Sequence, residues 1–372
     1  MEQFDFWDGL TGLQRRLVDL LRSMAESETV FIGAKDILRR LATEEWKMTE
    51  DEFEYECEEM NIQVGPIESY RPKSVGRAYR LLLEMGAPWR IRYPYFDLRG
   101  MVGALHDDAP SGPDGVSLRL SPFAQMVLPV GKAPLLPAAL LNGVSLPDGS
   151  HIPPHNLQEL WMALEAVRQN PGVELDDLME VLPGPDFASG GVVGGAKAIR
   201  SLYADGKTEM VLRGKIEAEI EGGRTRVAIM SLPPGVLVRT IIEQIRGLAG
   251  RERLFLYEMK DRSERHAVRI TLDLPRRYSA AAVKEILYRE TDLERRGVFR
   301  LSVSDGSGRS GEGTLISILK EAVLRLSPAW ERKDGAPTDS VPFLKEILEV
   351  GGYKSPLSDL TDDRRSRLLD LF

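Results

Sequence analysis

The stretch "HIPPHNLQEL", residues 151–160, lies where a proline-rich segment meets a helical pattern. Residues 133–157 are dense in proline and glycine, so we expect an irregular connector there. Residues 157–172 and 174–182 have the apolar spacing of helices, and Asn-Pro-Gly ends the first. The sequence "LPGPDFASGGVVGG", residues 182–195, follows directly. Its glycines come without the lysine of a phosphate-binding loop, so they indicate backbone geometry rather than phosphate binding.

The composition predicts a globular protein of two or three domains, with 372 residues, 42% hydrophobic and 28% charged. The net charge is −8, and residues 44–59 alone hold nine acids and one lysine. Residues 69–99 reverse this balance, with seven basic residues and two acids. A local basic patch is compatible with nucleic-acid binding despite the acidic total, although such a run is also typical of a solvated face.

Several classes of protein are not expected. The N-terminus has no basic segment followed by an apolar run, and no stretch approaches the roughly 20 apolar residues of a membrane span. Cys57 is the one cysteine, which excludes an intrachain disulfide and a cysteine metal cluster. The four histidines lack metal-ligand spacing: His106, His151, His155 and His266. We therefore expect a cytoplasmic protein with no membrane contact, metal or cofactor.

The first part of the chain has the layout of a winged helix, in which several short helices precede a hairpin. Helical patterns with one apolar face cover residues 8–24, 34–46, 49–60 and 74–86. In the acidic third helix, Phe53 and Cys57 share one side, and the fourth helix stops at Gly86. Residues 89–105 alternate apolar and polar side chains, which predicts a strand or hairpin.

The second half of the chain reads as a mixture of strands and helices. Residues 207–233 predict a hairpin with "EGGR" in its turn, followed by a helix over 235–248, a strand over 267–275 and a helix over 280–290. Residues 302–313, "SVSDGSGRSGEG", have the composition of a flexible linker. The remaining tail has a helical pattern that "GGYKSP" interrupts.

Two of these motifs resemble a known family. "IPPHNL" at 152–157, and "GPDFASGG" at 184–191 about thirty residues later, are similar to I-P-P-H-N-L and G-P-D-F-P-T-G-G of the A subunit of bacterial type IIA topoisomerases, DNA gyrase and topoisomerase IV. Further similar segments occur in the family's order: "DGLTGLQRRL", "LLNG", "KTEMVLRGKIEAEIE", "SLPPGVLVRTIIEQI", "LYRETDL" and "PLSDLT".

The resemblance implies an α+β fold of three parts. A winged-helix-like DNA-gate domain is expected over residues 1–130 and a tower-like α/β domain over 131–300. A flexible linker and a short helical remnant of the dimerisation region are expected over 301–372. The family's arm that docks on the B subunit, its long coiled coil and its C-terminal wrapping domain are expected to be absent. Without the coiled coil, we expect a monomer or a weak homodimer.

The resemblance also implies a loss of chemistry. The family's tyrosine forms a covalent phosphotyrosine with DNA, an adjacent arginine and a histidine steady the phosphate, and the B subunit supplies Mg²⁺. In alignment, the tyrosine falls on Gly115 and the arginine on Asp114, while Arg71 and Lys73 replace two histidines. No catalytic residue is therefore assigned. Tyr93 and Tyr95 are the nearest alternatives in sequence, and strand tyrosines are more often packing residues.

Candidate DNA contacts follow from the same resemblance. Cations on the presumed DNA face would give salt-sensitive binding with little sequence preference. Residues 57–61 argue against binding, because acids stand there in place of basic residues that touch the DNA backbone. Leu146 is the candidate for the residue that wedges between base pairs. The candidate DNA-binding residues are Arg15, Arg16, Arg71, Lys73, Arg77, Arg80 and Arg119.

Three functions remain open. The first is a non-cleaving, structural or regulatory DNA-binding protein, associated with the nucleoid if it binds double-stranded DNA. The second is a protein-interaction factor whose acidic helix binds a topoisomerase A-like or B-like subunit. The third is an ATP-dependent topoisomerase subunit that acts with a B-like partner and whose nucleophile comes from elsewhere.

Overall fold

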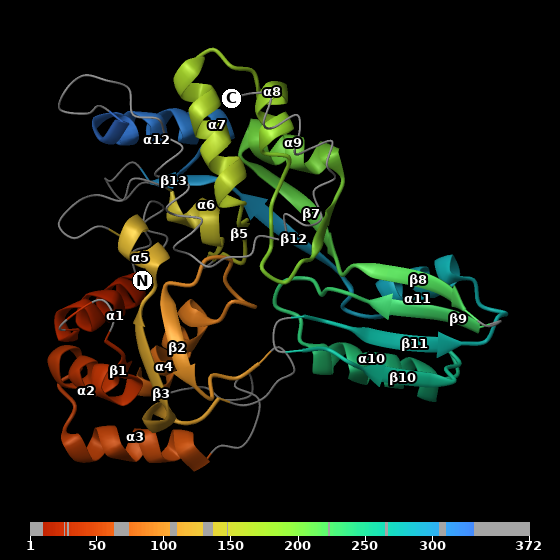
Figure 1. The fold of residues 1–372 in the computed structure, drawn as a ribbon, viewed down its shortest axis with the longest axis horizontal. Helices are drawn as coiled ribbons and strands as arrows, with labels where there is room; N and C mark the ends of the chain where they lie inside the picture. The colour runs from red at the N-terminus through yellow and green to blue at the C-terminus, as the bar shows by residue number, and fades with distance from the viewer. Residues whose placement is uncertain are drawn as a thin grey trace.

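The structure, a computed structural model, describes residues 10–330 apart from 26, 28–29, 63–73, 105–109, 129–136, 147, 222–223, 265–266 and 305–309. It is a mixed α+β fold, as expected (Figure 1). The helical N-terminal part lies at one end and an antiparallel sheet with two helices at the other. Within the described residues, no helix is long and apolar enough to cross a bilayer.

The N-terminal part has the helices and hairpin expected of a winged helix. The helices are α1 (Gly12–Met24), α2 (Ala34–Glu45), α3 (Glu50–Ile62) and α4 (Ser74–Gly86). The sheet has the order β1 (Ile32–Gly33), β3 (Val116–Leu120), β2 (Phe96–Gly100), and all its pairings are antiparallel. Thr11 starts α1 with a capping box, in which its side chain and that of Gln14 bond each other's backbone. The strand predicted over 89–105 is shorter, because residues 89–95 form turns that place Tyr93 and Tyr95 in the core.

A five-stranded sheet forms the middle of the molecule, in the order β4 (Val144–Ser145), β5 (His151–Ile152), β12 (Glu294–Arg300), β7 (Lys207–Arg213), β6 (Val192–Gly194). The helices near it are α6 (Ala138–Asn142), α7 (Leu157–Gln169), α8 (Leu175–Val181) and α9 (Ala196–Asp205), while α5 (Pro122–Val127) contacts β3 of the N-terminal sheet. The expected irregular connector over 133–157 is wrong in part. It contains α6 and the β4–β5 pairing, because four consecutive apolar residues, 138–141, are buried in the core.

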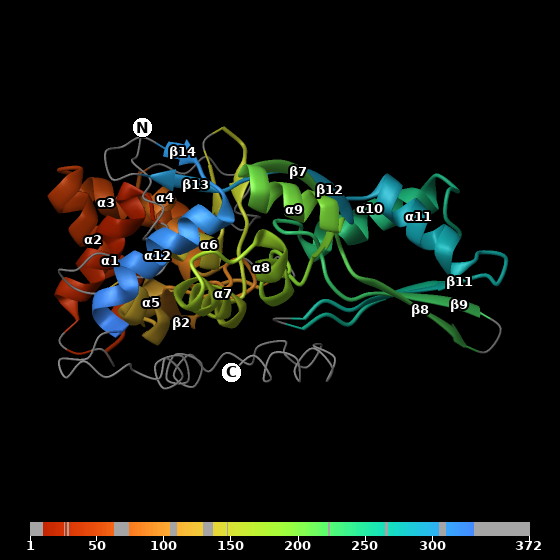
Figure 2. The same cartoon turned by 90° about the horizontal axis from the view of Figure 1, so that it is seen from above.

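The distal end is a four-stranded antiparallel sheet, hereafter the distal unit with residues 216–293. Its order is β10 (Glu258–Asp261), β11 (Ile270–Leu274), β9 (Arg224–Ile229), β8 (Ile216–Glu221). Helices α10 (Val238–Gly250) and α11 (Ala280–Glu290) cover one face (Figure 2). The hairpin predicted over 207–233 is therefore β8–β9 alone. β7 instead pairs with β12 in the middle sheet over seven residues of register.

The glycine-rich stretch predicted as a flexible linker also differs. Its described ends pair as β13 (Ser302–Ser304) and β14 (Ser310–Glu312), and α12 (Leu315–Trp330) follows and packs against α7. The interrupted helical tail predicted beyond α12 lies outside the described residues.

Buried apolar side chains form two clusters. The larger joins the N-terminal helices to α7, the middle sheet and α12, and it crosses the expected boundary at residue 130. The smaller lies between the sheet and helices of the distal unit.

Candidate nucleic-acid interface

Gly115 ends a single 3₁₀ turn, Pro113–Gly115, that leads into β3. A Cβ atom at this position would lie 2.5 Å from the Ser111 hydroxyl oxygen. That hydroxyl donates a hydrogen bond to the Met101 carbonyl oxygen at 3.2 Å, and the Ser111 backbone N–H donates to the same oxygen at 2.8 Å. Gly115 is itself exposed, but a side chain there would require Ser111 to move. Glycine offers no side chain to attack a phosphate.

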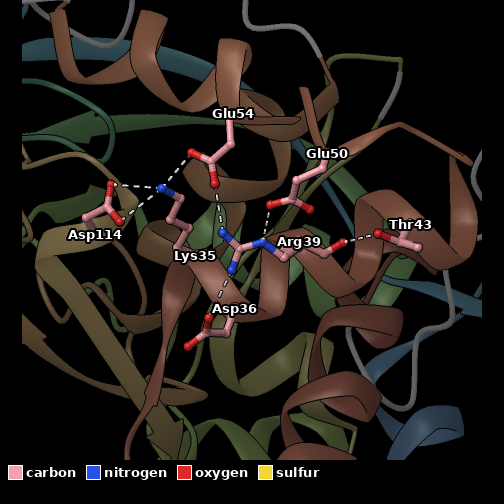
Figure 3. Close-up of polar contacts among 7 residues, drawn as sticks. All are labelled: Lys35, Asp36, Arg39, Thr43, Glu50, Glu54 and Asp114. Atoms are coloured by element: carbon pink, nitrogen blue, oxygen red, sulfur yellow. Dashed lines mark hydrogen bonds and ion pairs between the residues drawn. The ribbon is translucent and has the colours of Figure 1, made fainter. Parts of the chain in front are cut away.

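Asp114, beside it, belongs to a chain of ion pairs that crosses from the loop to α2 and α3 (Figure 3). Lys35 Nζ lies 3.2 Å from Asp114 Oδ1 and 2.8 Å from Glu54 Oε2. One turn further along α2, Arg39 lies 2.8 Å from carboxylate oxygens of both Glu50 and Glu54. The hydrogen bonds from Lys35 and Arg39 lower the pKa of Glu54, and the bond to Glu54 raises the pKa of Lys35. The cations of α2 are thus neutralised by acids of the same chain.

Sequence reasoning did not single out Lys35 and Arg39. The available signal was a matched spacing, since Lys35 and Arg39 are four residues apart on α2 and Glu50 and Glu54 are four residues apart on α3. Residues four apart share one helix face, so two such pairs with opposite charge can meet across adjacent helices.

The candidate DNA-contacting cations are dispersed. Arg16 lies 2.5 Å from Glu44 and 2.6 Å from Glu45, at the end of α2. Arg119 lies 2.9 Å from Asp97, and its guanidinium stands over a phenylalanine ring at 4.9 Å. Both engage acids of the same chain, which reduces the positive charge that they offer to a phosphate.

The remaining candidates have varied surroundings. Arg77 is exposed on α4, and Arg80 is half-buried one turn later. Arg15 donates to the Leu10 carbonyl oxygen at 3.5 Å. Leu146 lies at the turn of the β4–β5 hairpin, where it is half-buried and packs against the larger cluster. The positions of Arg71 and Lys73 lie outside the described residues.

The tyrosines near the site are packing residues, as the sequence suggested for Tyr93 and Tyr95. The Tyr93 hydroxyl accepts a hydrogen bond from the Leu157 backbone N–H at 2.7 Å, and Tyr95 is 2% exposed. Tyr79 on α4 donates its hydroxyl proton to the Ser111 carbonyl at 2.6 Å, and burial raises its pKa. A buried phenol with a raised pKa is a poor nucleophile, so none of these hydroxyls is placed to replace the missing side chain.

The motifs at 152–157 and 184–191 build the core of the middle layer. His155 is fully buried, and its Nδ1 lies 3.1 Å from the Leu140 carbonyl, which can only accept. Nδ1 therefore carries the proton, and Nε2 accepts from the Tyr203 hydroxyl at 3.0 Å. Burial lowers the pKa of His155 to about 4. In this structure His155 is a buried, hydrogen-bonded core residue.

Asp186 fixes the second motif against the first. Its carboxylate lies 2.5 Å from Arg92 Nη2 and accepts a hydrogen bond from the Asn156 side chain at 3.3 Å. The Asn156 side-chain oxygen in turn caps the first turn of α7. Arg92 belongs to the basic stretch 69–99. Because it is largely buried and pairs with Asp186, it does not contribute to an exposed basic patch.

Cys57 is buried, and burial raises the pKa of its thiol to about 11, which fits a packing residue. In the part of the chain that the structure describes, no group of three or more histidine, cysteine, aspartate or glutamate side chains is arranged to hold a metal ion.

The mixed α+β fold, with its N-terminal helices and hairpin, middle sheet and distal α/β unit, is consistent with the type IIA topoisomerase A-subunit class. The family model for the A subunit of DNA gyrase/topoisomerase IV matches residues 129–333, more than half of the chain. This chain belongs to that family.

Individual relatives support this family assignment. The chain is 30% identical over 250 residues to the DNA gyrase A subunit of Kosmotoga olearia, with 60% of this chain and 31% of the relative covered. It is 29% identical over 253 residues to the DNA topoisomerase 4 A subunit of Bacillus subtilis, with 61% and 31% covered. The chloroplastic/mitochondrial DNA gyrase A subunit of Arabidopsis thaliana is 29% identical over 292 residues, with 70% and 30% covered. The chain spans about a third of the length of these relatives.

Proposed function

We propose that this chain is a topoisomerase A-subunit relative that binds double-stranded DNA without cleaving it and has a structural or regulatory role there. The observation that carries the proposal is the pairing of Asp114 with Lys35 beside Gly115. A carboxylate stands where the family alignment has a phosphate-steadying cation, and the cation next to it is already shared with Glu54.

The chemistry of strand cleavage supports this proposal. Phosphoryl transfer to a protein needs an oxygen nucleophile and positive groups at the developing charge. Gly115 supplies no oxygen. Asp114 carries a negative charge that repels a phosphate, and Lys35, which pairs with it, is shared with Glu54. The hydroxyls of Tyr79 and Tyr93 are already hydrogen-bonded, and Tyr95 is buried.

Cleavage is tested with the purified chain, a DNA gyrase B subunit, Mg²⁺, ATP and supercoiled plasmid. We expect no covalent protein–DNA adduct after denaturation, while a gyrase A subunit under the same conditions gives one. We also expect Gly115→Tyr alone to give none, because Asp114 remains beside it in place of a phosphate-steadying cation and a side chain there would displace Ser111. An adduct formed by the unmodified chain would overturn the proposal and favour a nucleophile from elsewhere.

DNA binding rests on the cations of α4 and of the stretch before it. Arg77 is exposed there, and Arg71 and Lys73 lie just upstream in the sequence. Binding of a fluorescent duplex of about thirty base pairs is measured over a salt series. The logarithm of the affinity should fall with the logarithm of salt concentration, with a slope of about −0.9 for each phosphate contacted.

Arg77→Glu should reduce that slope, whereas Arg239→Glu on α10 is the matched control and should leave it unchanged. Arg239 is exposed at the distal unit and lies 3.0 Å from Glu243, outside the proposed interface. Absence of binding at 50 mM salt would contradict the DNA-binding part of the proposal without restoring cleavage.

A second function has its own support. Acids of α2 and α3 neutralise Arg16, Lys35 and Arg39, which lowers the positive field of the presumed DNA face. If DNA does not bind, the acidic surface favours a protein-interaction factor for a topoisomerase A-like or B-like subunit. Capture of purified gyrase subunits in nuclease-treated solution, lost with Glu58→Lys, would support this second function.

A further inference from the structure

The end of the distal unit carries exposed aromatic rings interleaved with arginines. Phe255 is 51% exposed and Tyr257 is 55% exposed, and their rings meet edge to face with centroids 5.7 Å apart. Arg224 stands over the Tyr257 ring at 5.0 Å, and Arg277 stands over the Phe255 ring at 5.6 Å. We call these four residues the distal patch.

The distal patch is positively charged and held in place. Within the described part of the chain, neither Arg224 nor Arg277 forms an ion pair with a carboxylate. The backbone N–H of Phe255 donates to the Tyr278 hydroxyl at 3.3 Å, and that of Tyr257 donates to the Asp273 carbonyl at 2.8 Å. Arginine stacked on a ring loses little freedom when it binds a carboxylate, and exposed aromatic residues with arginine are typical of the centre of protein interfaces.

The opposite end of the molecule presents the complementary surface. On α3, Asp51, Tyr55 and Glu58 are exposed at the spacing of one helix face, and Tyr55 is 57% exposed. The other face is occupied, since Phe53 is buried and Glu54 pairs with α2 (Figure 3). We call this acid–tyrosine–acid row the α3 stripe. Its carboxylates are opposite in charge to the arginines of the distal patch, and its tyrosine ring is of the same kind as the aromatic rings there.

We propose that the distal patch binds the α3 stripe of a second copy of this chain. The two surfaces lie at opposite ends of the molecule, because Arg224 follows the β8–β9 turn at the far end from α3 (Figure 1). The contact therefore forms between molecules. It joins unlike surfaces, so it builds open chains or, where the rotation between copies closes, rings.

A protein segment fits the distal patch better than nucleic-acid bases do. Bases stack on open ring faces, but here guanidinium groups already stand over both exposed rings. The 89° angle between the rings also forms a corner rather than a flat platform. This inference is independent of the proposed DNA binding, since it uses neither the α4 cations nor Gly115.

The test is sedimentation of the nuclease-treated chain over a concentration series at 0.05 M and 1 M NaCl. At low salt the average mass should rise with concentration to at least twice that of the monomer. At 1 M salt, where charges are screened within about 3 Å, the rise should be lost. Arg224→Glu/Arg277→Glu and Asp51→Lys/Glu58→Lys should each remain monomeric at low salt.

A mixture of these two charge-reversed variants provides the decisive arm. Each variant alone sets like charges against each other, but in the mixture both patch–stripe combinations have opposite charges, so association should return. The matched control is Arg246→Glu/Arg296→Glu, which alters two exposed arginines outside the patch and should associate like the unmodified chain. A monomer at every concentration would overturn the inference. Association that persists in both charge-reversed variants would also overturn it. The same holds if the patch variant loses DNA binding while it still self-associates.

Discussion

Lys35 Nζ lies 3.2 Å from Oδ1 of Asp114, the residue that precedes Gly115. The same ammonium group lies 2.8 Å from Glu54 on α3, so one side chain holds the loop and a helix together. Its side chain is 21% exposed, which leaves the pairing partly shielded from water. Lys35 therefore fixes the loop, and its charge is neutralised by Asp114 and Glu54 instead of being offered to DNA.

Replacement of Lys35 by methionine should destabilise the protein modestly. Asp114 would then lose its cation and Glu54 would keep only Arg39, and for a partly exposed pair we expect a loss of about 1 kcal/mol in the free energy of unfolding. Urea denaturation measures this loss. Lys207→Met, at an exposed position on β7, is the control. Adding Asp114→Asn to Lys35→Met should recover part of the loss, and a Lys35 variant as stable as the control would refute the expectation.

The sequence predicted most helices well because their apolar spacing is local. A period of 3.6 was enough to assign the apolar residues of α1 to one face, which are Leu13, Leu17, Leu20, Leu21 and Met24. The strand partners could not be read in the same way. β7 looks like the first strand of a hairpin with β8, yet it pairs with β12 about eighty residues later, and periodicity carries no information on such distant partners.

The candidate site was predictable only in part, for a related reason. Alignment with the family identified position 115, but the neutralisation of Lys35 and Arg16 depends on where α3 and the end of α2 pack. Basic residues were counted as a patch from charge alone. Arg92 shows the limit of that count, because its charge is taken by Asp186, 94 residues away.

His155 gives a pH-dependent prediction. Its pKa is about 4 in the folded protein against an ordinary 6.5, so below pH 6.5 the unfolded chain takes up a proton that the folded chain takes up only near pH 4. The free energy of unfolding therefore falls as the pH is lowered through this window, by up to about 1.4 kcal/mol for each pH unit.

His155→Gln provides the comparison. The variant should be less stable at pH 7.5 by about 1–3 kcal/mol, because hydrogen bonds to Leu140 and Tyr203 are disturbed. It has no imidazole to protonate, so the difference in the free energy of unfolding between the variant and the unmodified protein should become smaller as the pH falls from 6.5 to 4. Urea denaturation at several pH values measures this difference, and a constant difference would rule out the buried neutral histidine.

Asp186 should be more important for stability than a surface acid. Asp186→Ala would leave Arg92, whose side chain is 14% exposed, without its carboxylate partner, and would also remove an acceptor for Asn156. We expect a loss of about 3 kcal/mol, as for other partly buried pairs broken at one partner. Asp176→Ala removes the exposed pair with Arg200 and should cost much less than Asp186→Ala, because solvent screens this pair. Equal losses in the two variants would contradict this assignment.

Helix α12 supplies the sharpest test of how far the larger core extends. Leu319 is fully buried against that core, whereas Leu324, five residues later on the same helix, is 74% exposed. Leu319→Ala should therefore lower the free energy of unfolding by about 2–5 kcal/mol, while Leu324→Ala should change it by less than about 0.5 kcal/mol. The two variants make the same chemical change in the same helix, so a difference between them reports packing rather than helix propensity. Similar, small effects at both positions would mean that α12 is an appendage, and that the core ends with the middle sheet.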